Sequence, residues 1–406
     1  MKRVSKRRML GGGLMAWAAS LGLAACAHKI PQTDTATPAA IDVKGEAVAG
    51  KVPFQLYRGN RLFIDVMVGD ETISALVDTG ASMSVVDMKL AARAGLASEK
   101  SVEARGATGV GQGEILRHVD LRLGALDISG IQPIALDLGT IEAGLGRAVP
   151  MIVGKDIFDR FVVSFDWARH QLVFRAPGDY RVPAGSSVLS LGTEGELRTI
   201  PLTIAGMPAT EAIVDLGNGG AISLPKAYWT AQPMLTALPK TAWEFGGYGG
   251  WQPARMTTLP EVELGGFTLE RVPTMLSEYE PAGAAEEINV GFGILSQFDF
   301  SLDMTGNRLV LERRVDGYGH FPRDRSGMRS ELIPEGLRIR FVAPGSPAAK
   351  AGLTAGAIIT AIDGQRVDKT FYASPHAGWE ERPAGTIVRI ETAGGKAVAL
   401  KLEDYF

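Results

Sequence analysis

A six-residue motif that occurs twice constrains the fold of this chain more than any other feature. Residues Ala75–Gly80 (Ala-Leu-Val-Asp-Thr-Gly) recur as Ala212–Gly217 (Ala-Ile-Val-Asp-Leu-Gly), so that position 78 corresponds to position 215, 137 residues later. An ordered series of matches on one spacing predicts two similar lobes. The further pairs on that spacing are Gly69 and Gly206, Gly109 and Gly246, Gly113 and Gly250, Gly154 and Gly291, Phe161 and Phe298, Asp166 and Asp303, and Leu172 and Leu309.

Short apolar runs predict that both lobes are built from strands. In the first lobe, Leu62–Val68 alternates between apolar and polar residues, and Thr72–Val77 is an apolar run that ends at an aspartate. Helical signal is limited to segments such as Met88–Ala94. We therefore expect a mostly β chain, in which residues 52–180 and 187–314 form two closed or barrel-like lobes related by a pseudo-twofold axis.

Composition narrows the function classes. A net charge of −3 gives no basic field for nucleic acid, and the single cysteine rules out a disulfide within the chain. The five histidines show no zinc-binding spacing, and there is no Walker-type loop and no Gly-x-Ser-x-Gly motif. We expect neither a metal nor a cofactor.

The motif and its surroundings carry a family resemblance. Val77–Ser82 (Val-Asp-Thr-Gly-Ala-Ser), followed by Ile152-Val153-Gly154 and by the second copy of the motif, resembles retropepsin-like and pepsin-like aspartic proteases over about residues 52–314. The resemblance implies that Asp78 and Asp215 are two catalytic carboxylates held close together. Two such groups cannot both ionise, so they share one proton, and one acts as base on a water while the other acts as acid.

The residues that follow the two aspartates have different expected roles. Gly80 and Gly217 allow a tight turn and close backbone approach. The family uses a threonine hydroxyl to brace the dyad from the opposite loop, and Thr79 fits that role. The second copy has Leu216 in place of threonine, so the brace is absent there. Asp215 is either the second catalytic group or the turn-capping aspartate of a decayed lobe.

Two glycine-rich stretches lie at equal distances from the aspartates. They contain Gly109, Gly111 and Gly113 in the first lobe and Gly246–Trp251 in the second. The resemblance implies flap hairpins that fold over a cleft and clamp an extended peptide, with Tyr248 and Trp251 contacting substrate. The alternative is exposed turn glycines with the aromatic residues packed on the lobe.

The last part of the chain resembles a second family. Pro344–Leu353, Gly356–Ile359 and Ile362-Asp363-Gly364 together resemble a bacterial PDZ domain covering about residues 322–406. Such domains bind peptide C-termini by strand addition, with backbone amides holding the carboxylate. The expected carboxylate-binding loop is Ser326, Gly327 and Met328. The alternative is a packing domain without a ligand.

The N-terminus indicates export. Basic residues 2–8 precede an apolar run that ends Leu-Ala-Ala-Cys at Cys26, which resembles a bacterial lipoprotein cleavage site. This predicts a signal peptide over 1–25, lipid on Cys26, and a flexible linker over 26–51. The alternatives are a plain secretory peptide and an uncleaved anchor helix, and Arg7-Arg8 leaves both export routes open. Ala27 rather than aspartate follows the cysteine, so we expect the periplasmic face of the outer membrane.

Together these features predict an aspartic endopeptidase that cleaves polypeptides of the cell envelope. The PDZ-like module would recruit substrate or regulate access. Two other functions remain open: a non-catalytic peptide-binding scaffold with a degenerate second lobe, and a homodimeric protease that uses Asp78 of two chains.

Overall fold

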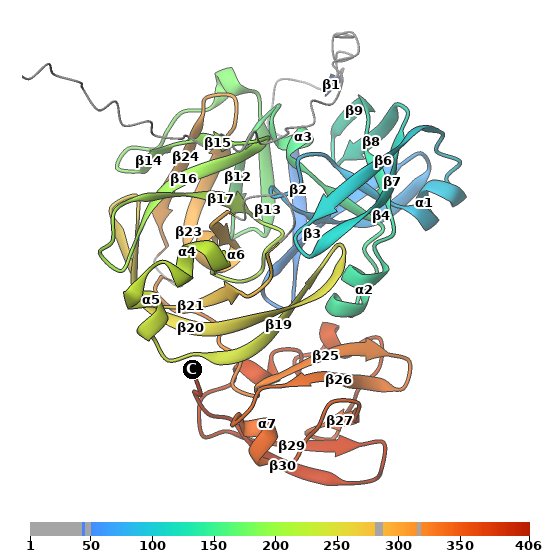
Figure 1. Cartoon of the computed structure of the whole chain (residues 1–406). Coiled ribbons are helices and arrows are strands. Elements are labelled where there is room, and N and C mark those ends of the chain that lie inside the picture. The colour runs from blue at the N-terminus through green and yellow to red at the C-terminus, as the bar shows by residue number, and fades with distance from the viewer. Residues whose placement is uncertain (1–42, 45–49, 281–286, 315–317) are drawn as a thin grey trace, which may run out of the picture. The chain divides into compact units, whose positions relative to one another are not determined.

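The computed structural model of the chain describes residues 43–44, 50–280, 287–314 and 318–406 (Figure 1). The predicted signal peptide, Cys26 and nearly all of the predicted linker lie outside the described residues. Strands dominate the described chain, so the prediction of a mostly β fold is confirmed. Within these described ranges, no helix has the length and apolar character that crossing a bilayer requires.

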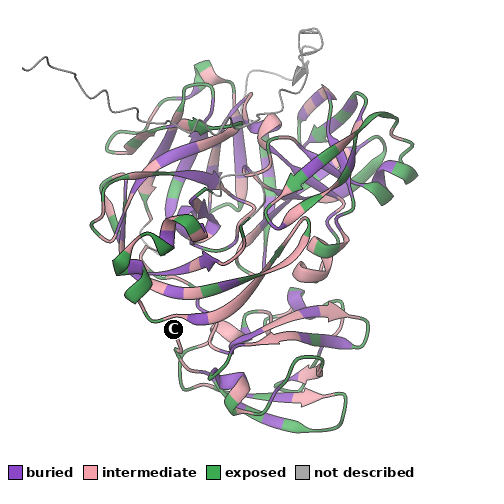
Figure 2. Ribbon diagram, viewed as in Figure 1, coloured by how far each residue is buried: buried purple, intermediate pink, exposed green. Residues whose placement is uncertain are grey.

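The first half of the chain forms a β lobe with short helices. Within it, β3 pairs with β4 and, through its last two residues, with β8. Burial alternates along its strands, and the apolar side chains face inward (Figure 2). The elements are β1 (Val43–Lys44), β2 (Gly50–Tyr57), β3 (Arg61–Val68), β4 (Glu71–Val77), β5 (Val85–Asp87), α1 (Met88–Arg93), β6 (Ser98–Gly106), β7 (Gly109–Leu116), β8 (Val119–Leu123), β9 (Leu126–Ile131), β10 (Ile134–Leu136), α2 (Gly139–Leu145), β11 (Met151–Val153), α3 (Lys155–Phe158), β12 (Val162–Asp166) and β13 (Gln171–Arg175).

The second half forms another β lobe, whose strands close into a ring. Here β16 pairs with both β17 and β20, which closes the ring of strands. The elements are β14 (Ser187–Ser190), β15 (Gly192–Glu194), β16 (Leu197–Ile204), β17 (Thr210–Asp215), β18 (Ile222–Leu224), α4 (Lys226–Thr230), α5 (Pro233–Ala237), β19 (Thr241–Gly247), β20 (Gly250–Leu264), β21 (Phe267–Ser277), β22 (Asn289–Gly291), α6 (Phe292–Leu295), β23 (Phe298–Asp303) and β24 (Arg308–Arg313).

The strand pairings of the first lobe recur in the second. β4 pairs in parallel with β11, and β17 pairs in parallel with β22. β5 and β10 are parallel, as are β18 and β21. Helices α3 and α6 begin at positions 155 and 292, on the same 137-residue spacing, and the glycine before each has nearly the same backbone angles.

One sheet joins the two lobes. β12 and β13 of the first lobe lie beside β23 and β24 of the second, and β12 pairs directly with β23. The hydroxyls of Ser164 and Ser301 are 2.7 Å apart across this junction. These two residues are counterparts in the repeat, and a residue meets its own counterpart only at a twofold axis. The lobes are therefore related by a pseudo-twofold axis that passes close to this serine pair.

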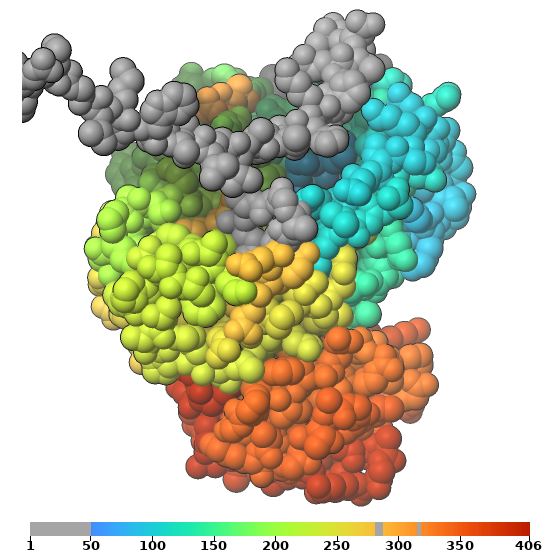
Figure 3. Space-filling model, in the orientation of Figure 1, coloured from blue at the N-terminus to red at the C-terminus, as the bar shows by residue number. Residues whose placement is uncertain are grey.

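The C-terminal module is a separate sheet with its own apolar core. Phe371, Val388 and Leu400 are fully buried in it. Its core is continuous with apolar residues of the first lobe, and Tyr57 and Tyr372 lie edge to face with ring centroids 6.1 Å apart. In Figure 3 the module lies directly against residues of the second lobe's long hairpin. The elements are β25 (Met328–Ile333), β26 (Gly336–Val342), α7 (Pro347–Lys350), β27 (Ile358–Ile362), β28 (Gln365–Arg366), β29 (Ile387–Thr392) and β30 (Ala397–Lys401).

Candidate active site

The two repeated aspartates lie at equivalent strand ends. Asp78 directly follows β4, and its N–H donates to the carbonyl of Val153 on the parallel neighbour β11 at 3.0 Å. Asp215 is the last residue of β17 and is paired with Gly291 on β22. Buried apolar residues anchor β4 and β17 in the cores of their lobes. Both carboxyls therefore lie where the two lobes meet.

Each carboxyl packs against the glycine that follows the other aspartate. A Cβ on Gly217 would lie 2.2 Å from Cγ of Asp78, and a Cβ on Gly80 would lie 2.6 Å from Cγ of Asp215. Real Cβ atoms do not come this close to other heavy atoms, so only glycine fits at both positions. The reciprocal contact is what a twofold axis produces, and it places the two carboxyls side by side.

The proximity of the carboxyls governs their protonation. The pKa of Asp78 is raised well above its usual range, first by burial and then by the negative charge of Asp215 and a hydrogen bond with that carboxyl. Because two carboxylates held side by side repel each other, the protonated form of Asp78 is favoured more than in an isolated aspartate. Within the described chain there is no cluster of three or more metal-ligating side chains.

The hydrogen-bond donors around the two aspartates differ. Oδ1 of Asp78 accepts the N–H of Gly80 at 2.8 Å. Oδ1 of Asp215 accepts the N–H of Asn218 at 2.9 Å, and its Oδ2 accepts Nδ2 of Asn289 at 2.6 Å. The side-chain Nδ2 of Asn218 in turn donates to Oδ1 of Asn289 at 2.8 Å. This second hydrogen bond orients the side chain of Asn289 toward Asp215. Both carboxyl oxygens of Asp215 therefore accept hydrogen bonds from N–H groups of its own lobe.

Thr79 links the two aspartate loops, as the resemblance implied. Its buried hydroxyl donates to the carbonyl of Val214 at 2.8 Å and accepts the N–H of Leu216 at 3.1 Å. Leu216, its counterpart in the repeat, is fully buried in the apolar core instead. One threonine therefore provides the brace, and an apolar side chain anchors the other loop.

Replacing Thr79 by valine should destabilise the fold. The change keeps the shape but leaves a buried carbonyl and a buried N–H without partners, each costing about 1–3 kcal/mol. We expect the free energy of unfolding in urea to fall by that order, while Thr79→Ser, which keeps the hydroxyl, should lose much less. Equal losses in the two variants would contradict the bridging role of the hydroxyl.

The glycine-rich stretches form hairpins whose tips touch. β6–β7 turns at Thr108, β19–β20 turns at Tyr248, and Oγ1 of Thr108 donates to the carbonyl of Tyr248 at 3.0 Å. Gly109 and Gly111 allow the two tips to come this close. A Cβ on Gly109 would lie 3.2 Å from Cα of Gly249, and a Cβ on Gly111 would lie 2.4 Å from the hydroxyl oxygen of Tyr248. The two hairpins therefore meet each other, one from each lobe.

The remaining predicted flap residues pack against protein. A Cβ on Gly113 would lie 2.5 Å from the side chain of Leu136, so this glycine serves close packing within the first lobe. The ring of Trp251 lies beside Gly144 of α2 and Gly246, and the guanidinium of Arg340 stacks over it at 4.5 Å. These contacts favour the packing alternative for Trp251, and substrate contact by Tyr248 stays a prediction.

The loop predicted to hold a peptide carboxylate is already hydrogen-bonded to a carboxylate of the chain. The N–H groups of Ser326 and Gly327 donate to Asp324 at 2.9 and 3.1 Å, and the N–H of Met328 donates to Oγ of Ser326 at 3.1 Å. The hydroxyl of Tyr405 also donates to Asp324, at 3.0 Å. An incoming peptide C-terminus would have to displace Asp324.

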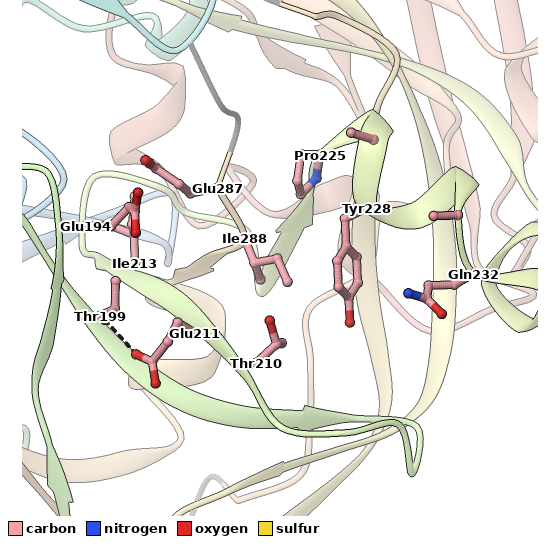
Figure 4. Close-up of a pocket in the computed structure, with 12 residues that line it drawn as sticks. Glu194, Thr199, Thr210, Glu211, Ile213, Pro225, Tyr228, Gln232, Glu287 and Ile288 are labelled. Atoms are coloured by element: carbon pink, nitrogen blue, oxygen red, sulfur yellow. Dashed lines mark hydrogen bonds between the residues drawn. The ribbon is translucent and has the colours of Figure 1, made fainter. Parts of the chain in front are cut away.

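A separate cavity lies on the second lobe. It has a volume of about 430 Å³, and Glu194, Glu211 and Glu287 give it an acidic lining (Figure 4). Burial, followed by the charge of Glu194, raises the pKa of Glu287. The lining includes neither Asp78 nor Asp215, so this cavity is distinct from the aspartate pair.

Comparison with known protein families assigns both segments of interest. Residues 64–157, which include Asp78 and the first hairpin, match the aspartyl protease family. The chain thus contains an aspartyl protease domain in its first half. Residues 338–371 match the PDZ domain family, so the C-terminal module is a PDZ domain. Neither match extends to Asp215, and no curated protein matches the chain.

Removing the internal carboxylate of the PDZ loop should destabilise the protein. Asp324→Ala takes the acceptor from two N–H groups and the Tyr405 hydroxyl, and each unsatisfied buried group costs about 1–3 kcal/mol. The free energy of unfolding should fall accordingly, while alanine at the exposed Glu335 of the same module should change it by less than about 0.5 kcal/mol. Equal stability of Asp324→Ala and wild type would show that the loop holds itself without Asp324.

Proposed function

We propose that this protein is an aspartic endopeptidase whose two catalytic carboxyls, Asp78 and Asp215, belong to one chain. The observation that carries the proposal is the reciprocal packing of each carboxyl on the other loop's glycine. This contact holds the groups as close as a shared proton requires. The match of residues 64–157 to the aspartyl protease family supports it independently.

The asymmetry of the pair assigns the roles. Asp215, which accepts hydrogen bonds from Asn218 and Asn289, takes a proton from a water whose oxygen attacks the peptide carbonyl carbon. Asp78 gives its proton to the carbonyl oxygen, which yields a neutral tetrahedral diol. Asp215 then donates its new proton to the amide nitrogen, one diol hydroxyl returns a proton to Asp78, and the C–N bond breaks to release a carboxylic acid and an amine.

The rest of the chain supports binding and location in this proposal. The touching hairpins act as flaps that cover an extended polypeptide and exclude water. The two lobes descend from one duplicated unit, which accounts for the constant spacing of their counterparts. The PDZ domain recruits substrate or regulates access, and lipid on Cys26 anchors the enzyme to the outer membrane on its periplasmic side, where envelope polypeptides are the substrates.

The alternatives are less well supported. A homodimeric protease needs Asp78 from two chains, whereas here one chain brings two carboxyls together. A decayed lobe needs no carboxylate network around Asp215, yet Asn218 and Asn289 both donate to it. A scaffold gains nothing from a pair of carboxyls in which burial, followed by the charge of Asp215, raises the pKa of Asp78.

Isosteric changes at the two aspartates test the proposal. Asp78→Asn and Asp215→Asn should each lower kcat/KM for a quenched peptide library by at least about 10²–10⁴-fold, because one group cannot be base and acid together. The double variant should be little worse, because the pair acts as a unit. Asp70→Asn, an exposed change in the turn before β4, is the matched control and should match wild type.

Dilution separates the mechanisms. Specific activity of the one-chain dyad stays constant as the protein is diluted, whereas a dimeric dyad loses activity as its chains dissociate. Full activity of Asp215→Asn would contradict the one-chain dyad. Wild-type protein that cleaves no peptide between pH 3 and 8 would support the scaffold.

A further inference from the structure

Arg61 lies beside the aspartate pair. It begins β3, and its Nη1 donates to the carbonyl of Asn60 at 3.0 Å. The same guanidinium packs on Gly219, where a Cβ would fall almost on top of Nη1. The carboxyl of Asp78 packs against Gly217, which stands two residues before Gly219 in the same turn. Two residues of chain span at most about 7 Å, so Arg61 lies within roughly 10 Å of the aspartates.

Arg329 of the PDZ domain faces the same region. It is the second residue of β25, and its guanidinium stacks over Trp243 at 5.1 Å and over Trp251 at 5.9 Å on the second lobe's hairpin. Its buried Nε has no hydrogen-bond partner. In the part of the chain that the structure describes, neither Arg61 nor Arg329 forms an ion pair with a carboxylate.

A third arginine shows the contrast. Arg58, in the turn just before Arg61, pairs with Glu380 of the PDZ domain at 3.1 Å and stacks over Tyr372. Burial, followed by the charges of Arg58 and Arg329, lowers the pKa of Arg61 to about 10. Arg58 therefore has a carboxylate partner in Glu380, whereas neither Arg61 nor Arg329 has a carboxylate within ion-pair distance among the described residues. Half-buried cations without partners are costly, and a bound anion removes that cost.

We propose that Arg61 and Arg329 form a subsite that binds an acidic side chain of the substrate, on the PDZ-facing side of the aspartates. This subsite rests on the proposed peptidase function and specifies its substrate class. Arginine suits the task because its planar fork binds a carboxylate through two parallel N–H···O bonds.

The distance fixes where the acidic residue lies in the substrate. An extended peptide advances about 3.3 Å per residue, so a separation of up to roughly 10 Å from the aspartates corresponds to three residues. The preferred Glu or Asp therefore stands within three residues of the bond that is cleaved. A free C-terminal carboxylate within the same reach offers the same chemistry to the two arginines.

Matched peptides measure the preference. A quenched, amidated peptide that wild type cleaves is varied by placing Glu or Gln at each of the three positions on either side of the scissile bond. We expect kcat/KM for Glu to exceed that for Gln by about tenfold or more at one position, mainly through KM, and to do so less at high salt. A peptide that ends at the preferred position is then compared as the free acid and as the amide. Faster cleavage of the free acid shows that a terminal carboxylate can replace the acidic side chain.

Arginine variants assign the preference. Arg61→Gln should bring the Glu/Gln ratio to about one, Arg61→Lys should keep part of it, and Arg329→Gln should lower it. Arg366→Gln, an exposed change on β28, should leave it unchanged. Equal rates for Glu and Gln peptides in an active, Asp78-dependent wild type would overturn the subsite while leaving the peptidase proposal intact.

Binding separates the two proposals when cleavage does not. Fluorescence anisotropy with the Asp78→Asn protein and the same peptides reports the subsite without turnover. Tighter binding of the Glu peptide that disappears with Arg61→Gln supports the subsite even if wild type cleaves nothing. Indifference to Glu in this assay overturns it.

Discussion

The close contact of two carboxyls across a pseudo-twofold axis is the constraint on which the rest of this structure depends. Each carboxyl lies on the glycine of the opposite loop, so neither loop tolerates a side chain there. Like charges at such a distance repel, and the fold must hold them together against that repulsion. The single bridge from Thr79 and the buried anchor Leu216 supply that hold from opposite sides.

The sheet that the two lobes share holds them together against the repulsion between the two carboxyls. β12 and β23 run side by side across the axis, and Phe165 stacks on Phe300 with ring centroids 3.9 Å apart. The lobes are thus joined by backbone pairing and by apolar burial, and neither can rotate freely against the other. The touching hairpins add a second junction, through Thr108 and Tyr248. Together these contacts fix the relative position of two strand ends that lie far apart in the sequence.

The sequence predicted the parts of this arrangement that depend on local pattern and on the repeat. Apolar runs located the strands, and the constant spacing paired Asp78 with Asp215. The sequence did not predict that Asn289 contacts Asp215. Asn289 stands 137 residues after Ile152, and a polar residue at this place of an otherwise apolar run was a signal that could have identified it. Hydrogen bonds such as that from Asn289 to Asp215 depend on side-chain geometry that spacing does not encode.

The PDZ loop and Trp251 show a second limit of prediction from sequence. Family motifs located Ser326–Met328, but not that Asp324, just before them, turns its carboxylate onto their amides. Trp251 stands in a glycine-rich stretch that is typical of a mobile flap. Its partners Gly144 and Arg340 come from segments about 100 residues away in either direction, and only the folded chain brings them together.

The pH dependence of stability tests most directly whether the fold raises the pKa of Asp78, as a proton shared between the two carboxyls requires. The free energy of unfolding is compared for wild type and Asp78→Asn across acid to neutral pH. A carboxyl whose pKa is raised in the fold is neutral in both states below the unfolded value of about 3.8. As pH rises above that value the unfolded state ionises first, so wild type should lose stability relative to Asp78→Asn until the folded pKa is passed. A difference between the two proteins that stays constant over the whole range would contradict a shared proton.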